Sequence, residues 1–351
     1  MTDNHKNRGI TMLTMTRRNL LQGTAAMGAL AFAGARTAFA QAPEDTKALY
    51  EAAKKEGTLT YYATAQAPIT KRVTDRFSEL YPGIKINVLR LATGQMAQRF
   101  ASEMQAGNIV ADVIQMADPL AFEDAAKAGW LAKPADLPAW SAFPKDYLTE
   151  HWALIGISPH TIVSNTDLVD AKDYPKDWKA MLDPRWKGQM ILSDPRNNME
   201  VADWAYTMFD AYGPEFLTGL KNQQPRFVES ILPGIQMLAA GEAMILAPAL
   251  HQATMLMMEK KAPVIDFSPA MTSGQETMMG VVAKAPHPNA ARLLANFLLT
   301  RDGQERYCRD IAASPLPDIP GALTLSPQYQ RGRYRQAAAK RAELAALLGL
   351  T

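Results

Sequence analysis

Histidine side chains are the first candidates for chemistry, because an imidazole can serve as a general base or as a metal ligand. After residue 40 the sequence holds four of them, His151, His160, His251 and His287. Their spacing does not match a zinc site, and the sequence contains no HExxH, CxxC, GxSxG or Walker-type glycine loop. A Ser-His-Asp set assembled in space stays open, since the members of a triad need not be close in sequence.

The stretch GEAMILAPALHQ, residues 241–252, places one of these histidines after an apolar run. Residues 243–249 are expected to form a buried strand, and His251 and Gln252 follow it. A buried strand that ends on two polar residues often leads into a site. From the stretch alone, four roles for His251 stay open: catalytic base, metal ligand, contact for another ligand, or polar strand end. The other three histidines are expected in loops, at strand edges or on the surface.

The elements that would position such a site alternate along the first part of the chain. A helix that ends at Gly57 comes first, and strands then alternate with amphipathic helices. This alternation indicates an α/β domain with a mostly parallel sheet. The predicted strands lie at 58–62, 84–89 and 111–116, the second one half-buried with Ile84, Ile86 and Val88 on its inner face; the helices start at Pro68, at Thr93 as N-cap, and near Pro119.

Three loops follow these strands, at 63–68, 91–95 and 117–119. Ligands of open α/β sheets bind outside the carboxyl ends of the strands. Each loop also opens a helix, so it presents unpaired N–H groups and the positive end of a helix dipole. An anion or a polar ligand is therefore expected there. Every α/β domain has such loops, so they indicate where a ligand would bind and not that one does.

The pattern restarts at about Trp152. Strands are expected at 160–165, 188–194, 225–230, 243–249, 262–270 and 276–286, and helices at 199–213, 233–242, 252–261 and 288–300, with a charged helical tail after Arg331. No internal repeat and no low-complexity tract interrupts the order. The second half of the chain is therefore also α/β.

Composition restricts the class of protein. The chain has 351 residues, 48% of them hydrophobic and 21% charged, which is typical of a soluble globular protein with two domains or one large one. Its formal charge is +2, but positions 1–40 hold five basic residues and one acidic residue. Without them the remainder has 32 basic and 34 acidic residues, so nucleic-acid binding has no electrostatic support.

Residues 1–40 have the three-part design of an export signal. The segment TRRNLLQ precedes an apolar, Gly- and Ala-rich stretch, and Ala38-Phe39-Ala40 forms an A-x-A cleavage site. The paired arginines indicate a twin-arginine signal, cleaved after Ala40. The apolar stretch is shorter than the roughly 20 residues of a membrane span. The mature chain is therefore expected in the periplasm, and with Cys308 as its one cysteine it cannot form an internal disulfide.

Several longer phrases resemble one family. NTDLV…YPKDWKAMLDPRWKGQMILSDPRNN, residues 165–198, is similar to the second-domain segment of periplasmic solute-binding proteins of ABC transporters, above all the ferric-iron type and its phosphonate-binding relatives. The same family is matched by LYEAAKKEGTLTYY (49–62), FASEMQAGNIVADVI (100–114), PGIQMLAAGEA (233–243) and KAPHPNAARLLANFLLTRDGQE (284–305). The resemblance thus covers nearly the whole mature chain.

The resemblance implies a two-lobed type II periplasmic binding fold. Each lobe would be a mixed, mostly parallel five-stranded sheet flanked by helices, with the ligand in the cleft between the lobes. The chain would cross near 150–158 and return near 262–268. Lobe 1 would contain residues 41–152 and 266–351, and lobe 2 residues 153–265. The implied partners are a small-molecule ligand and an inner-membrane permease with a cytoplasmic ATPase. We expect a monomer without a cofactor and without catalysis.

The family's iron site is not preserved. Iron-binding members use an adjacent tyrosine pair, which would fall at about residues 250–252, where this chain has Leu250, His251 and Gln252. Neutral imidazole and amide groups are poor ligands for a hard trivalent ion.

The first hypothesis is therefore binding of a small, anionic organic solute, namely a phosphonate, a phosphate ester or a carboxylate. The predicted contacts are Gln66, Thr93, Gly94, Asp118, Ser193, Arg196, Asn197, Asn198, Ser230, His251 and Gln252, with no metal ligands. Ferric-iron capture and an exported hydrolase are the alternatives.

Overall fold

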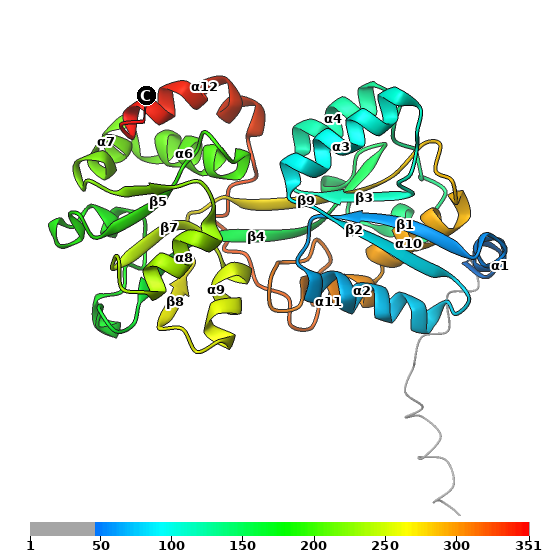
Figure 1. Ribbon diagram of the computed structural model, residues 1–351, viewed down its shortest axis with the longest axis horizontal. Coiled ribbons are helices and arrows are strands. Elements are labelled where there is room, and N and C mark those ends of the chain that lie inside the picture. Colours follow the sequence, from blue (N-terminus) through cyan, green and yellow to red (C-terminus); the bar gives the residue numbers. More distant parts are fainter. Residues whose placement is uncertain (1–45, 351) are drawn as a thin grey trace, which may run out of the picture. The chain divides into compact units, whose positions relative to one another are not determined.

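The computed structural model describes residues 46–350, and the predicted export signal lies outside this range. Within it, nine strands form one continuous arrangement in the order β2-β1-β3-β9-β4-β7-β5-β6, with β8 paired to β4 (Figure 1). The arrangement consists of two five-stranded sheets that share β4 (Trp152–Asn165). The mixed α/β fold with helices flanking the sheet is therefore confirmed.

The first sheet contains β1 (Thr58–Ala63), β2 (Lys85–Arg90), β3 (Val113–Met116) and β9 (Gly274–Val281), together with the first part of β4. β1 pairs in parallel with β2 and β3, whereas β9 runs antiparallel to β3 and β4. The carboxyl ends of the three parallel strands consequently meet at one edge, as the alternation of elements predicts.

The second sheet repeats this design with β5 (Met190–Ser193), β6 (Arg226–Val228), β7 (Ile245–Leu250) and β8 (Val264–Phe267). β5 is parallel to β6 and β7, and the second part of β4 is antiparallel to β7 and β8. β4 therefore runs through both sheets, and its residues form the structural link between them (Figure 1).

Helices cover both sheets, and most begin at strand ends. Those of the first sheet are α1 (Lys47–Glu56), α2 (Ala67–Leu80), α3 (Thr93–Ala106), α4 (Pro119–Lys127), α5 (Pro138–Ala142), α10 (Pro288–Leu299) and α11 (Arg301–Cys308). Those of the second sheet are α6 (Met199–Tyr212), α7 (Pro214–Asn222), α8 (Ile231–Ala239), α9 (His251–Glu259) and α12 (Tyr334–Leu347). Short 3-10 turns lie at Lys145–Tyr147, Ala171–Asp173, Lys179–Leu182 and Pro184–Trp186.

Local signals fix the helix ends of the first sheet. Gly57 ends α1 with a positive φ of 71°, as expected for a C-cap glycine. α3 differs slightly from prediction, because Ala92 is its N-cap and Thr93 is its first residue, without a side-chain cap hydrogen bond. β2 differs too. Val88 is 44% exposed, since β2 pairs with β1 alone and forms the edge of the sheet.

The last helix departs from the predicted grouping of residues 266–351 with lobe 1. α12 packs on α6 (Figure 1). Its Leu344 and the following Leu348 join the core that contains Trp178 and Trp204, whose rings meet edge to face. The helical pattern of charged residues after Arg331 does not by itself show which part of the protein the helix packs against. The division of the chain into two lobes at the predicted boundaries stays a prediction.

Residues 309–333, here called the strap, lead from α11 to α12. The strap pairs with β4 where Ile157 and Ala313 exchange two backbone hydrogen bonds of 3.0 and 2.7 Å. Farther along, Arg331 forms a 2.6 Å ion pair with Glu276 of β9. The strap is therefore a third connection between the two sheets, beside β4 and the segment that joins β8 to β9.

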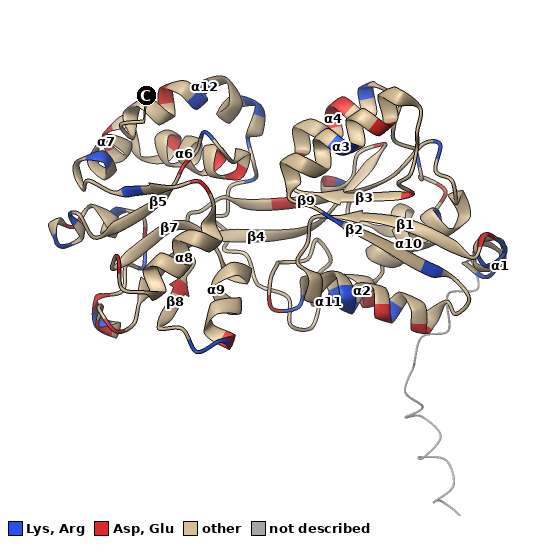
Figure 2. Ribbon diagram, viewed as in Figure 1, with Lys and Arg blue, Asp and Glu red and all other residues tan. Residues whose placement is uncertain are grey.

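Lys and Arg residues are interspersed with Asp and Glu along the helices and loops in the face that Figure 2 shows. Within residues 46–350, no helix is both long enough and apolar enough to cross a membrane.

Candidate functional site

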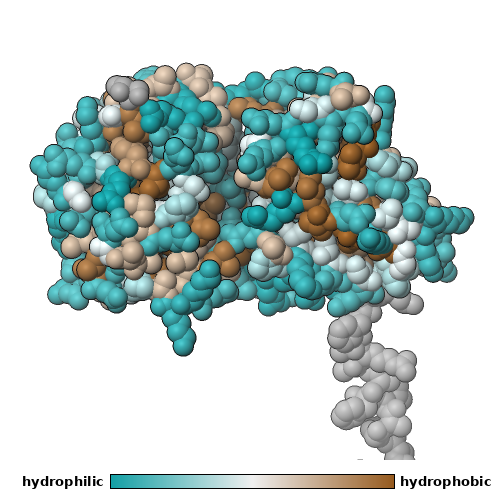
Figure 3. Space-filling view, viewed as in Figure 1, coloured by the Kyte–Doolittle hydropathy of each residue, from teal (hydrophilic) through white to brown (hydrophobic). Residues whose placement is uncertain are grey.

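A cavity of about 160 Å³, here called the cleft cavity, lies where the carboxyl ends of β1, β2 and β3 meet the start of α9. The space-filling view shows the molecule hollowed between the elements of the two sheets (Figure 3). The walls of the cleft cavity are mostly polar. They come from the ends of β1, β2 and β3, from β4 and β9, from α9, and from α11 and the residues that follow it. Of the predicted contacts, Gln66, Thr93 and Gln252 line it together.

Arg90 is the one charged residue that lines the cleft cavity. It is the last residue of β2, and its Nε donates a 2.9 Å hydrogen bond to the carbonyl of Ala65. This bond fixes the guanidinium beside the loop that precedes α2. The two terminal nitrogens make no hydrogen bond to the described part of the chain, so they are available to a ligand.

Helix termini add to this positive character. α2 and α3 begin at Ala67 and Thr93, directly beside the cleft cavity, and no side chain caps either one. The first N–H groups of a helix have no partner within the helix, and its dipole is positive at that end. A guanidinium between two such termini, with no carboxylate among the lining residues, forms a site for an anion.

The floor of the cavity is held by a buried amide. Oε1 of Gln115, at 1% exposure, accepts hydrogen bonds from the N–H groups of Thr64 and Ala65 at 3.1 and 3.2 Å. Its Nε2 donates to the Tyr307 hydroxyl at 3.3 Å. Burial raises the pKa of Tyr307, so its phenol stays protonated and is not available as a phenolate.

Gln252 is the contribution of the second sheet to this cavity. Its Nε2 donates a 3.3 Å hydrogen bond to Oε1 of Gln275 in β9. Ser158 of β4 lies in the same wall, and its hydroxyl donates to the carbonyl of Ile311 at 2.8 Å. The wall formed by β4, β9 and α9 is thus uncharged and hydrogen-bonding.

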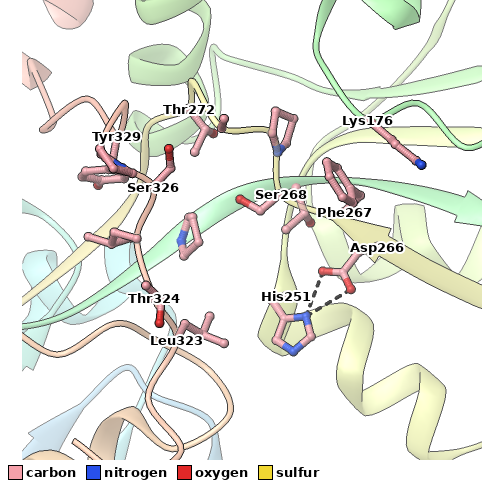
Figure 4. Close-up of a pocket in the computed structure, with 16 residues that line it drawn as sticks. Lys176, His251, Asp266, Phe267, Ser268, Thr272, Leu323, Thr324, Ser326 and Tyr329 are labelled. Atoms are coloured by element: carbon pink, nitrogen blue, oxygen red, sulfur yellow. Dashed lines mark hydrogen bonds and ion pairs between the residues drawn. The ribbon is translucent and has the colours of Figure 1, made fainter. Parts of the chain in front are cut away.

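A second and larger cavity, here called the strap cavity, lies between β4, the segment that joins β8 to β9, and the strap (Figure 4). Its volume is about 620 Å³. His251 lines this cavity and not the cleft cavity, although the next residue, Gln252, lines the latter. Alternation along β4 agrees with this division: Ser158 faces the cleft cavity, whereas Pro159 and Thr161 face the strap cavity.

His251 is held in place by Asp266 of β8. Its Nδ1 lies 2.9 and 3.1 Å from the two carboxylate oxygens (Figure 4). This hydrogen bond raises the pKa of His251, and the negative charges of Asp266 and Asp310 raise it further, whereas burial acts to lower it. The imidazole is therefore a positioned, partly buried group with its Nε2 left for other contacts.

Three other contacts predicted from the second sheet are engaged with the protein itself. Ser193 is buried and donates to the carbonyl of Pro248 at 3.0 Å. Arg196 forms an ion pair of 2.9 Å with Asp194. The Asn198 amide donates to the carbonyl of Glu229 at 3.1 Å. None of these three lines the cleft cavity or the strap cavity.

Four predicted contacts lie at the starts of helices or turns, outside the walls of both cavities. The carboxylate of Asp118 caps α4 by accepting from the N–H of Ala121 at 3.0 Å. The other three are Gly94 in the first turn of α3, Asn197 in the turn before α6, and Ser230 at the N-cap of α8.

Sequence reasoning did not single out Arg90, Gln115, Gln275 or Tyr307. Arg90 and Gln115 could have been found, because Arg90 directly follows the predicted strand 84–89 and Gln115 lies near the end of the predicted strand 111–116. Gln275 and Tyr307 come from segments far along the chain, and no local pattern connects them to the loop at 63–68.

The remaining histidines differ from the expectation in one case. His160 is predicted at a strand edge or in a loop, but it lies inside β4 and is fully buried. Burial lowers the pKa of His160 to about 3, so it is neutral at ordinary pH. Nowhere between residues 46 and 350 do three or more His, Cys, Asp or Glu side chains gather in a way that could hold a metal ion.

Comparison with known proteins places these features in context. Residues 58–309, more than half of the chain, match the family model described as bacterial extracellular solute-binding protein. An uncharacterised protein of Haemophilus influenzae is 28% identical over 141 residues, a match that spans 38% of this chain and 40% of that protein. This chain therefore matches less than half the length of that curated relative.

Solved structures share the fold at low sequence identity. Iron-bound HitA from Pseudomonas aeruginosa is 19% identical with a TM-score of 0.65, over 82% of this chain and 99% of HitA. AfuA from Actinobacillus pleuropneumoniae, solved with fructose-6-phosphate, is 18% identical with a TM-score of 0.66, over 84% of this chain and 99% of AfuA. One fold thus accommodates a metal ion in one relative and a sugar phosphate in another.

Proposed function

The chain belongs to the family of bacterial extracellular solute-binding proteins, and on that premise we propose that it captures a small anionic organic solute in the cleft cavity. The solute class is a phosphonate, a phosphate ester or a carboxylate. In this proposal the protein is the periplasmic component of an ABC import system and delivers its solute to an inner-membrane permease with a cytoplasmic ATPase. The expected form is a monomer, released from its leader after Ala40.

The position of the Arg90 guanidinium in the cleft cavity is the observation that supports this proposal. A guanidinium with two unengaged nitrogens can grip a carboxylate or a phosphate with two parallel hydrogen bonds. The hydrogen bond from Nε of Arg90 to the carbonyl of Ala65 holds the guanidinium in position. No carboxylate lines the cavity that could compete with a ligand for the guanidinium. Hydrogen-bonding side chains of Gln66, Thr93 and Gln252 surround the same space and would recognise the polar part of the solute.

Ferric iron is less well matched to these residues. A hard trivalent ion needs phenolate or carboxylate oxygens. The cleft cavity offers one phenol, Tyr307, and burial keeps it protonated. The organic anion is therefore the favoured solute.

Binding without chemistry is the corresponding proposal for activity, since members of the family are binding proteins. The His251–Asp266 pair resembles part of a catalytic triad. It lines the strap cavity and is separated by β4 from the proposed solute site, so it has no place in the capture of the solute.

Isothermal titration calorimetry of the purified protein tests the solute class. The probes are methylphosphonate, glycerol 3-phosphate, acetate and inorganic phosphate, with ferric citrate and citrate alone as a matched pair. We expect saturable one-to-one binding of at least one phosphonate, phosphate ester or carboxylate. At 100 times its dissociation constant such a ligand should add about 2.7 kcal/mol to the free energy of unfolding.

Two results would overturn the proposal. The first is one-to-one binding of ferric ion, seen by elemental analysis and a tyrosinate absorbance band, without any response to the anions. The second is the absence of heat and of any melting-temperature shift with all four anions.

A further inference from the structure

We propose that the strap cavity is a second ligand site, which takes a small amphipathic molecule with an apolar ring-sized body and a hydrogen-bond acceptor at one end. Nothing in the capture of a solute requires this site, because the strap cavity and the cleft cavity lie on opposite faces of β4. The inference rests on the volume of the cavity, on its walls and on two polar atoms.

The volume and the walls indicate the body of the ligand. The cavity encloses about 620 Å³, within the range of ordinary small-molecule sites. Its walls are largely apolar, and Phe267 is left 42% exposed beside it. Burying such a side chain against a ligand is favourable by the hydrophobic effect. The apolar walls are formed by Pro159, Phe267, Pro269, Leu323, Leu325 and Pro327.

His251 indicates the polar end of the ligand. Asp266, whose carboxylate is only 5% exposed, accepts from Nδ1. This contact fixes the ring and raises the pKa of His251, which favours the imidazolium form with a proton on Nε2 as well as on Nδ1. Nε2 then presents an N–H donor with no partner among the described residues. Since Asp266 balances its charge, the acceptor need not be charged, so a carbonyl can serve as well as a carboxylate or a sulfonate.

Thr161 supplies a second polar atom in the same wall. The residue is only 2% exposed, and its Oγ1 has no hydrogen-bond partner between residues 46 and 350. A buried hydroxyl without a hydrogen-bond partner is unfavourable. If the side chain turned toward the cavity, a ligand group there would satisfy this hydroxyl, which can donate and accept.

Three chain segments enclose the site, and they are the three connections between the two sheets. Pro159 and Thr161 belong to β4, Ser268 and Thr272 to the segment between β8 and β9, and Leu325 to the strap (Figure 4). The cavity is therefore built by the tertiary structure and is not a groove on one element.

Two fluorescent probes of matched shape test the proposal. One is 8-anilinonaphthalene-1-sulfonate, which has an apolar body and a sulfonate acceptor, and the other is N-phenyl-1-naphthylamine, which lacks the sulfonate. We expect saturable one-to-one binding of the sulfonate probe at pH 7 and about tenfold weaker binding of the neutral probe, the usual value of a hydrogen bond to a charged group.

Two substitutions of exposed strap residues locate the binding. Thr324→Trp places a large side chain in the wall of the cavity, whereas Gln328→Trp adds the same side chain to the same segment outside that wall. Thr324→Trp should weaken binding of the sulfonate probe at least about tenfold, and Gln328→Trp should leave it unchanged. Circular dichroism and melting temperatures verify that both variants are folded. Equal binding of the probe by the two variants would overturn the proposal.

His251→Gln keeps the test decisive if Thr324→Trp does not fold. It should reduce the affinity for the sulfonate probe to that for the neutral probe and leave the neutral probe unaffected. If wild-type protein binds both probes equally, or if His251→Gln leaves their difference intact, the proposed ligand class is wrong.

Discussion

The cleft cavity and the strap cavity share two walls, yet they differ in chemistry. In β4 the neighbours Ser158 and Pro159 face different cavities, and at the start of α9 the neighbours Gln252 and His251 do the same. The cleft cavity is small, polar and carries one guanidinium. The strap cavity is about four times larger and mostly apolar, and it is lined by the His251–Asp266 pair and by Lys176.

This difference teaches how one stretch of chain can serve two environments. Successive side chains of a strand point to opposite faces, so a register shift of one residue would exchange the two linings. Ser158 and Gln252, which line the cleft cavity, lie on the side of Arg90 and the helix N-termini, where an anion is stabilised. Four predictions can break or sharpen this comparison, and they follow in order of expected effect.

Arg90→Ala should have the largest effect on solute binding. A hydrogen bond to a charged group contributes about 1.5–3 kcal/mol, so the affinity for the anion should fall roughly tenfold to a hundredfold. Arg196→Ala is the matched control, because Asp194 already engages that guanidinium outside the cavity. Calorimetry with the best-bound anion measures both. Equal losses in the two variants would remove Arg90 from the site.

His160, which lies in β4, should make the stability of the folded protein decrease in acid. Its pKa is lowered to about 3 by burial, whereas an unfolded histidine titrates near 6.5. The unfolded chain therefore binds more protons below pH 6.5, and stability falls as the pH decreases. At pH 5 this group should reduce the free energy of unfolding by about 2 kcal/mol relative to pH 8.

Urea unfolding at pH 8 and pH 5 measures this effect, and His160→Leu should show a smaller difference between the two pH values. Because the substitution also changes packing, only the difference within each protein is compared. An identical pH dependence in both proteins would mean that His160 takes up a proton in the folded state.

Gln252→Ala should affect binding in the cleft cavity and not in the strap cavity, although the adjacent residue His251 lines the latter. The substitution removes the bond to Gln275 and any contact with the solute, so the affinity for the anion should decrease about fivefold, corresponding to ~1 kcal/mol. Binding of 8-anilinonaphthalene-1-sulfonate in the strap cavity should stay the same. A parallel decrease for both ligands would show that the cavities respond as one site.

Asp266→Asn should give the smallest effect, with a defined sign. The pKa of His251 is raised by Asp266 in the folded protein, so this stabilisation is fully present below about pH 6.5 and is lost as the pH rises through the folded pKa. The wild type should therefore exceed the variant in stability more at pH 6 than at pH 9. The difference should stay under ~1 kcal/mol, because His251 is partly exposed. Melting temperatures over this range test the sign, and a larger gap at pH 9 would contradict it.

The sequence determined the elements and the edge at which a site forms. Periodicity, C-cap glycines and helix-starting prolines are local properties, so β1, β2, β3 and the helices that follow them were predictable from short windows. Since parallel strands place their carboxyl ends together, Gln66 and Thr93 could be assigned to one cavity without a structure.

Only the tertiary structure decided which cavity each candidate lines and which candidates are engaged elsewhere. His251 lines the strap cavity because Asp266, fifteen residues farther along the chain, holds its ring there. Arg196 is paired to Asp194, whereas Arg90 and Tyr307, which lie far apart in the sequence, line one cavity. Hydrogen bonds and ion pairs between segments far apart in sequence depend on how the elements pack, and no local pattern encodes that packing.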